Sequence, residues 1–291
     1  MSRPPSPATT PSRTAPDAGR RAFGDARRRW LRLGLAGPAA VAATAAATLP
    51  GCALWLRDDD QEDEREQAPP IAADDLSDSD WARASALVDG PARWLHLRFR
   101  GRKPTRYQPR WHQGRPALRA DSERGSSVVR QQMQRPPTQP ARLVFSWWVD
   151  ALQADFDIRA RDTDDAVARV IVSFDADRSR FTARDAMLSE LALLVTGQPL
   201  PAATIEYVWD AHLPAGTVLA SSYSTRVRYI VAESGSARLS QWVDIERDLH
   251  ADFARAFNEP PAAITGVGVM TDANDTLGQV RAWYGPLRWA V

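Results

Sequence analysis

The sequence predicts a mainly β protein, folded as a single antiparallel β-sandwich with one or two short helices at its edges. From residue 94 to the C-terminus, short segments alternate between apolar and polar residues, and Pro, Gly, Asp and Asn separate them. Only two segments instead repeat their apolar residues at helical spacing. Because the predicted strands follow one another without helical crossovers, we expect mainly antiparallel sheets.

The clearest predicted strand covers residues 166–174. Its alternation places Ala168, Val170, Val172 and Phe174 on one face, which is typical of a strand with one buried side. Further strands are predicted at residues 94–99, 126–133, 143–149, 204–209, 226–232, 241–246, 264–270 and 279–289.

Two segments predict helices. Residues 182–195 begin with Thr182 and Asp185, at the spacing of a capping box. In residues 248–257, large apolar side chains recur every four residues from Leu249, so they fall on one helical face. We expect both helices to pack on the edges of the sandwich.

Charge and composition exclude some classes of protein. The net charge of the 291-residue chain is +1, but residues 1–51 hold eight Arg and two Asp, so residues 52–291 carry −5. An acidic body lacks the basic footprint of a nucleic-acid-binding protein, and we expect no nucleic-acid partner. One Cys cannot form a disulfide within a monomer, and four scattered His offer little for a zinc site.

Residues 1–51 have the pattern of an export signal. A basic run at residues 27–32 precedes an uncharged stretch, 33–56, that contains Leu-Pro-Gly followed by Cys52. The basic run resembles a twin-arginine signal, with Trp30 where Phe is usual, and the tetrapeptide resembles the lipobox of bacterial lipoproteins. This resemblance implies cleavage before Cys52, lipidation of its thiol, and export to the periplasm or cell surface.

An uncleaved membrane helix is the alternative, because residues 33–56 are long enough to span a bilayer. Residues 52–75 are rich in Asp and Glu, which keeps such a segment extended and solvated, so they predict an acidic tether. Residues 76–291 are then the β-sandwich domain.

Residues spread from Trp94 to Trp289 carry a resemblance to a known family. The matching positions include Phe99, Gly101, Tyr107, Phe145, Trp147, Asp164, Asp165, Arg169, Tyr207, Trp209, Trp242, Asp252, Phe253, Asp272 and Tyr284. This order resembles domain of unknown function 3047, which implies a bacterial envelope protein and no established activity. The closing stretch, 266–289, also resembles the last strands of galactose-binding-like jelly rolls, which favours a jelly-roll form of the sandwich.

Three carboxylates are candidates for acid/base chemistry: Asp157, Asp164 and Asp165. Paired carboxylates can serve as acid and base when their environments separate their pKa values. Asp165 and Arg169 are also candidate ligand-binding residues. The alternative is a solvated turn in which Arg169 pairs with one of these Asp residues.

A short polar run holds the candidate metal ligands Asp272, Asn274 and Asp275. Their spacing suits an irregular Ca²⁺ site, but Leu277 stands where an EF-hand needs Gly, which excludes that motif. The alternative is a turn in which these side chains bond to their own backbone. Calcium is therefore a possible cofactor, and we expect no other.

Aromatic residues supply the remaining candidates. Trp147, Trp209 and Trp242 could stack on sugar rings, or they could be core residues that pack between sheets. Adjacent Trp147 and Trp148 must point to opposite faces of one strand.

Together these features favour a non-catalytic lipoprotein that binds a glycan or another cell-surface polymer, because no catalytic signature is present. The alternatives are a carboxylate-dependent glycan-active enzyme and a structural or assembly protein of the envelope.

Overall fold

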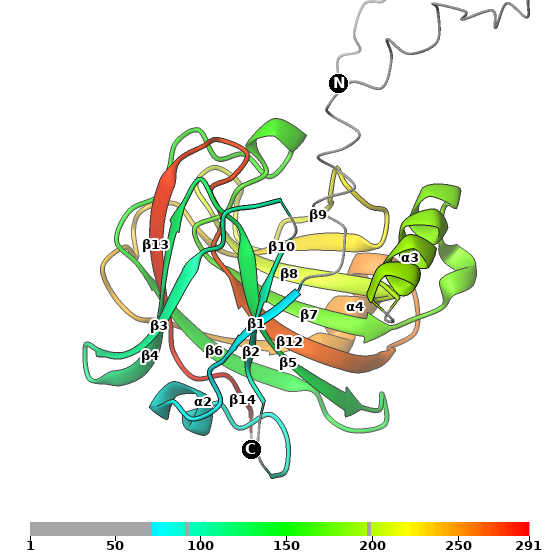
Figure 1. Ribbon diagram of the computed structural model, residues 1–291, viewed down its shortest axis with the longest axis horizontal. Helices are drawn as coiled ribbons and strands as arrows, with labels where there is room; N and C mark the ends of the chain where they lie inside the picture. Colours follow the sequence, from blue (N-terminus) through cyan, green and yellow to red (C-terminus); the bar gives the residue numbers. More distant parts are fainter. Residues whose placement is uncertain (1–70, 91–92, 100, 197–198, 291) are drawn as a thin grey trace, which may run out of the picture. The chain divides into compact units, whose positions relative to one another are not determined.

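The computed structural model describes residues 71–90, 93–99, 101–196 and 199–290. The predicted signal segment, Cys52 and most of the predicted tether lie outside the described residues. The described part of the chain is mainly β, with antiparallel sheets and a few short helices, as the sequence predicts (Figure 1).

The larger sheet has eight strands. In spatial order they are β1 (Ile71–Asp75), β2 (Leu95–Arg98), β5 (Ser127–Arg135), β12 (Ala263–Met270), β7 (Arg169–Asp175), β8 (Ala203–Asp210), β10 (Val227–Ser234) and β9 (Val218–Ala220). Neighbouring strands are antiparallel except β8 and β10, which run parallel. The chain between them crosses back and contributes β9, so a short strand and loops replace the helical crossover that is common elsewhere.

The smaller sheet has six strands. They are β11 (Val243–Asp248), β6 (Arg142–Val149), β13 (Gln279–Tyr284), β4 (Arg115–Glu123) and β3 (Arg106–His112) in order, with β14 (Arg288–Trp289) also paired to β6. All of its pairs are antiparallel.

Alternation along the strands produces one core between the two sheets. Phe145 and Trp147 of β6 contact Tyr207 and Trp209 of β8, with ring centroids 5.8 Å apart for Phe145–Tyr207 and 6.0 Å apart for Trp147–Trp209. All four side chains are almost fully buried. Because every second residue of β7 also joins this core, its other residues, Arg169 among them, point to the outer face of the larger sheet.

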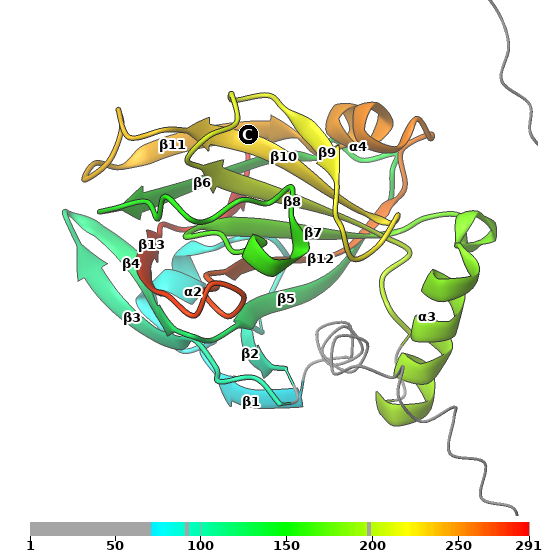
Figure 2. The same cartoon turned by 90° about the horizontal axis from the view of Figure 1, so that it is seen from above.

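The two predicted helices are confirmed. In α3 (Ala183–Thr196), the Asp185 amide donates to the Thr182 hydroxyl and the Thr182 amide donates to the Asp185 carboxylate, which is a capping box. In α4 (Leu249–Phe257), Asp248 caps the first turn and Asn258 ends the helix with φ of 54°. Figures 1 and 2 place α3 beyond the end of β7.

Several element boundaries differ from the sequence prediction. The predicted acidic tether ends too late, because residues 71–75 form β1 and pair with β2. The β3–β4 hairpin was not predicted, since Pro109 and Pro116 interrupt its alternation; β3 is an edge strand, where Pro costs little. A third short helix, α2 (Asp80–Ala84), was also missed.

Candidate functional site

A pocket opens on the face of the larger sheet that points away from the core. Its volume is about 230 Å³. The cross-strand register builds its floor from rows of residues on neighbouring strands, and one row runs through Arg130, Gly268, Ile171, Glu206 and Tyr229. Alternate residues of five strands thus face one cavity, which a sequence pattern along a single strand cannot show.

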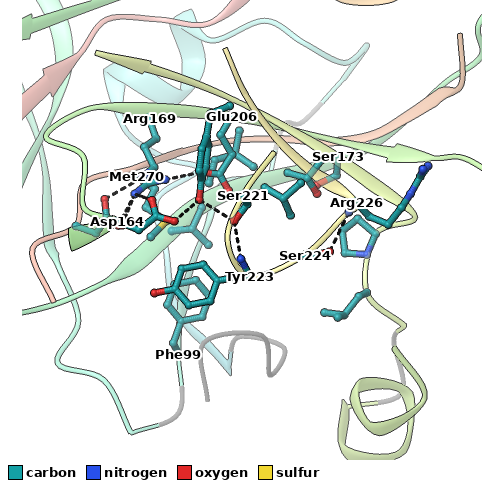
Figure 3. Close-up of a pocket in the computed structure, with 18 of the residues that line it drawn as sticks. Phe99, Asp164, Arg169, Ser173, Glu206, Ser221, Tyr223, Ser224, Arg226 and Met270 are labelled. Atoms are coloured by element: carbon teal, nitrogen blue, oxygen red, sulfur yellow. Dashed lines mark hydrogen bonds and ion pairs between the residues drawn. The ribbon is translucent and has the colours of Figure 1, made fainter. Parts of the chain in front are cut away.

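Arg169 holds a cluster of carboxylates at the end of this pocket (Figure 3). Its guanidinium donates to both Asp272 oxygens at 3.0 Å and to Glu206 Oε2 at 2.9 Å. The same side chain donates to Asp164 Oδ1 at 3.2 Å. Arg169, Asp164 and Asp272 are buried, so this network is an ion-pair cluster of low solvent access.

Asp164 is the group with the most altered acidity in this cluster. Burial raises the pKa of its carboxyl to about 7, although the neighbouring Arg169 opposes this rise. The Tyr229 hydroxyl lies 2.6 Å from Asp164 Oδ2 and 3.0 Å from Ser221 Oγ. Asp164 can therefore exchange a proton near neutral pH, next to the partly exposed Glu206.

The rest of the lining combines hydroxyl groups with apolar surface. The hydroxyl side chains are those of Ser173, Thr204, Ser221, Tyr223, Ser224 and Tyr229. The large apolar side chains are those of Phe99, Val128, Ile171, Phe181, Leu200 and Met270. Such a mixture suits a small ligand that has both hydrogen-bonding groups and an apolar face.

Among the predicted site residues, the structure brings Asp164, Arg169 and Asp272 together in this pocket. Asp165, the next residue, has another role. Its carboxylate accepts hydrogen bonds from the amides of Asn274, Asp275 and Thr276, at 2.7–3.2 Å, and from the Thr276 hydroxyl at 2.7 Å. It therefore fixes the turn that follows β12.

The three residues predicted as calcium ligands do not converge. Asp272 binds Arg169, while the amides of Asn274 and Asp275 point at Asp165, so this turn surrounds an anion rather than a cation. In the described part of the chain, no group of three or more His, Cys, Asp or Glu side chains could hold a metal ion.

Asp157 lies outside the pocket lining and pairs with Arg159, whose guanidinium donates to it at 2.7 and 2.8 Å. These bonds lower the pKa of Asp157 to about 2. The group is therefore a carboxylate at neutral pH, without the environment of a general acid.

The three candidate Trp residues lie apart from the pocket. Trp147 and Trp209 are core residues. Trp242 lies on the outer face of the smaller sheet, in an aromatic cluster with His112 and Trp148. Arg115 covers its ring at 5.1 Å.

Sequence reasoning missed Glu206, Tyr229 and Arg130 as pocket residues. The alternation of the strand at 204–209 could have placed Glu206 on the face opposite Tyr207, but nothing in the sequence indicated that this face is hollowed. Within the described residues, no helix has the length and apolar character needed to cross a bilayer.

Fold and site together define a mainly β protein with a pocket on an outer sheet face that is lined by apolar, hydroxyl and carboxylate side chains. The model of a family described as "Protein of unknown function (DUF3047)" matches residues 92–288, and the chain belongs to this family. The resemblance seen in the sequence is thereby confirmed.

Other comparisons add little. No curated protein matches the chain. A solved structure that resembles it is a meso-active, thermo-stable cellulase derived from Cel12A of Rhodothermus marinus. The two are 8% identical, the match covers 67% of this chain and 90% of that one, and the TM-score is 0.36.

Proposed function

We propose that the protein is an exported envelope lipoprotein whose β domain binds a saccharide unit of a cell-surface polymer in the outer-face pocket. The observation that carries this proposal is the pocket itself, with carboxylate and hydroxyl oxygens at one end and aromatic and aliphatic side chains around it. The proposed localisation in the envelope rests on the export pattern at residues 27–52 and on the lipid that Cys52 would carry. The partners are then a membrane and a glycan.

A saccharide suits the chemistry of this lining. Sugar hydroxyls donate to carboxylate oxygens, which Glu206 and Asp164 present beside the hydroxyl of Tyr229. The C–H face of a sugar ring packs against apolar surface such as Phe99. Since known ligand pockets measure roughly 300–1,000 Å³, a cavity of about 230 Å³ favours one small unit over a long segment of polymer.

We also infer that the two sheets form a jelly-roll-like sandwich. Support comes from their shared core and from the predominance of antiparallel pairs.

Calorimetric titration of the purified full chain with neutral and acidic monosaccharides and oligosaccharides tests the binding function. Saturable heat is expected for at least one saccharide. Phe99→Ala is expected to weaken that binding about five- to tenfold, because it removes an apolar wall of the pocket. Trp111→Ala is the control, since this side chain is 65% exposed on β3 of the other sheet. No heat with any saccharide would refute the proposal and favour a structural role.

A second candidate, a glycan-active enzyme, has one observation in its favour. Asp164, with a pKa of about 7, and Glu206 both bind Arg169, so an acid and a carboxylate line the same cavity. A time course of reducing-end release from the oligosaccharide that binds tests it. If the wild type releases reducing ends and Asp164→Asn binds the oligosaccharide without releasing them, the enzyme is favoured. If the wild type releases none, enzymatic activity on that substrate is excluded.

A further inference from the structure

Arg130 of β5 is a cation in the pocket lining that has no partner among the residues that the structure describes. Among the described residues, no carboxylate or carbonyl accepts a hydrogen bond from its guanidinium, and its Nε is buried without any acceptor. The other two pocket arginines differ. Arg169 binds three carboxylates, and Arg226 binds both Glu259 oxygens at 2.6 and 3.1 Å.

The surroundings of Arg130 disfavour its charge. Burial lowers the pKa of its guanidinium, and no neighbouring carboxylate offsets this effect. Glu206 is in the same cross-strand row, but β12 and β7 lie between (Figure 2). At about 4.8 Å per strand, three strand spacings place the two Cα atoms about 14 Å apart. Among the described residues, Glu206 pairs with Arg169 and not with Arg130. A poorly solvated, unpaired cation is costly unless something binds it.

Two glycines shape the floor beside this side chain. A Cβ on Gly268 would lie 2.8 Å from the Val129 carbonyl oxygen, so β12 approaches β5 too closely for any other residue there. A Cβ on Gly266 would lie 3.6 Å from both Cδ and Nε of Arg130. The Arg130 side chain therefore extends over β12, at positions where β12 has no side chains. It forms part of the wall of the pocket there.

We propose that the ligand of this pocket carries an anionic group, a carboxylate or a phosphate, that pairs with Arg130. This inference rests on the proposed saccharide binding, and it makes the ligand an acidic sugar. The sugar hydroxyls then face Asp164 and Glu206, and the anion lies across Ile171 at the β5 side of the floor. A guanidinium suits both anions, because its fork of donors binds two oxygens at once.

Titration of the full chain with glucuronate, glucose 6-phosphate and glucose tests the pairing. At least one anionic sugar is expected to bind tenfold or more tightly than glucose, and the stronger of the two identifies the anion. Arg130→Met is expected to abolish that preference, so that the anionic sugars no longer bind more tightly than glucose. Arg130→Lys is expected to keep part of the preference for anionic sugars, because the positive charge remains while the paired donors of the guanidinium are lost. Arg110→Met, an exposed arginine on β3, is the control and is expected to change nothing.

The outcomes separate this inference from the proposed function. If glucose binds as tightly as the anionic sugars, or Arg130→Met keeps their preference, the role of Arg130 is refuted while saccharide binding stands. If only inorganic phosphate binds, and Arg130→Met abolishes this, the anion site stands and saccharide binding fails. If neither sugars nor phosphate bind, both fail.

A ligand-free measurement provides a second readout. Removing an unpaired, desolvated cation is expected to raise the melting temperature of Arg130→Met by about 2–4 °C. Arg110→Met is expected to leave it unchanged, since Arg110 is exposed. A fall in the melting temperature of Arg130→Met would assign Arg130 a structural role and overturn the inference.

Discussion

Replacement of Asp164 by Asn is expected to stabilise the protein at alkaline pH more than at acidic pH. Burial raises the pKa of the Asp164 carboxyl from 3.8 to about 7 in the folded protein. Between these values the folded state keeps a proton that the unfolded state has lost, so this group's contribution to stability is present below about pH 4 and is lost as pH rises through 7. The shift of about three units corresponds to about 4 kcal/mol as an upper value.

Urea unfolding at pH 5 and pH 8, followed by Trp fluorescence, measures this effect. Asn is neutral throughout, so the free energy of unfolding of Asp164→Asn relative to wild type is expected to rise by about 2–3 kcal/mol between the two pH values. Comparison within this pair removes the titration of the groups that do not interact with Asp164, because both proteins share them.

Asp157→Asn is the matched control. Arg159 lowers the pKa of Asp157 to about 2, so its contribution is present above about pH 4 and is lost as pH falls through 2. This group does not titrate between pH 5 and pH 8, and its variant is expected to differ from wild type equally at both. If the free energy of unfolding of Asp164→Asn also differs from wild type by the same amount at pH 5 and pH 8, burial does not raise the pKa of the Asp164 carboxyl as argued.

Three further predictions concern the stability of the fold and the lipidation of Cys52. Asp165→Ala is expected to cost about 3 kcal/mol of unfolding free energy, because three backbone amides of the turn after β12 lose their acceptor; a loss under about 1 kcal/mol in urea unfolding would contradict this. Arg226→Met is expected to cost about 3–5 kcal/mol, because the buried Glu259 keeps only its longer contact with Arg180, at 3.7 Å, and adding Glu259→Met is expected to recover part of the loss in the same assay. Cys52→Ser is expected to abolish labelling of the protein by a fatty-acid probe, because the thiol that would carry the lipid is lost; labelling that persists in this variant would refute lipidation at Cys52.

The local elements could be predicted because their signals are local. The alternation at 166–174 correctly places Val170, Val172 and Phe174 on the core face, although β7 begins only at Arg169. Thr182 and Asp185 form their capping box within a single turn of chain. The β3–β4 hairpin was missed because tolerance of Pro109 depends on an edge position in the sheet, which is not a property of the segment.

The candidate site depends on contacts between distant segments. Asp164 meets Tyr229 from 65 residues away, and Asp165 holds a turn about 110 residues further along the chain. The sequence singled out both carboxylates from one loop but could not assign them different roles, because their roles come from these distant partners.

By itself, the sequence determined the family, the mainly β character and the alternation that gives each strand two faces. Only the tertiary structure decided which face became core and which became pocket. Trp147 is buried because β8 packs over its side of β6, whereas Trp148 points to the outer face. The physical reason is that alternation defines two opposite faces, while the burial of either one depends on what the rest of the chain packs against it.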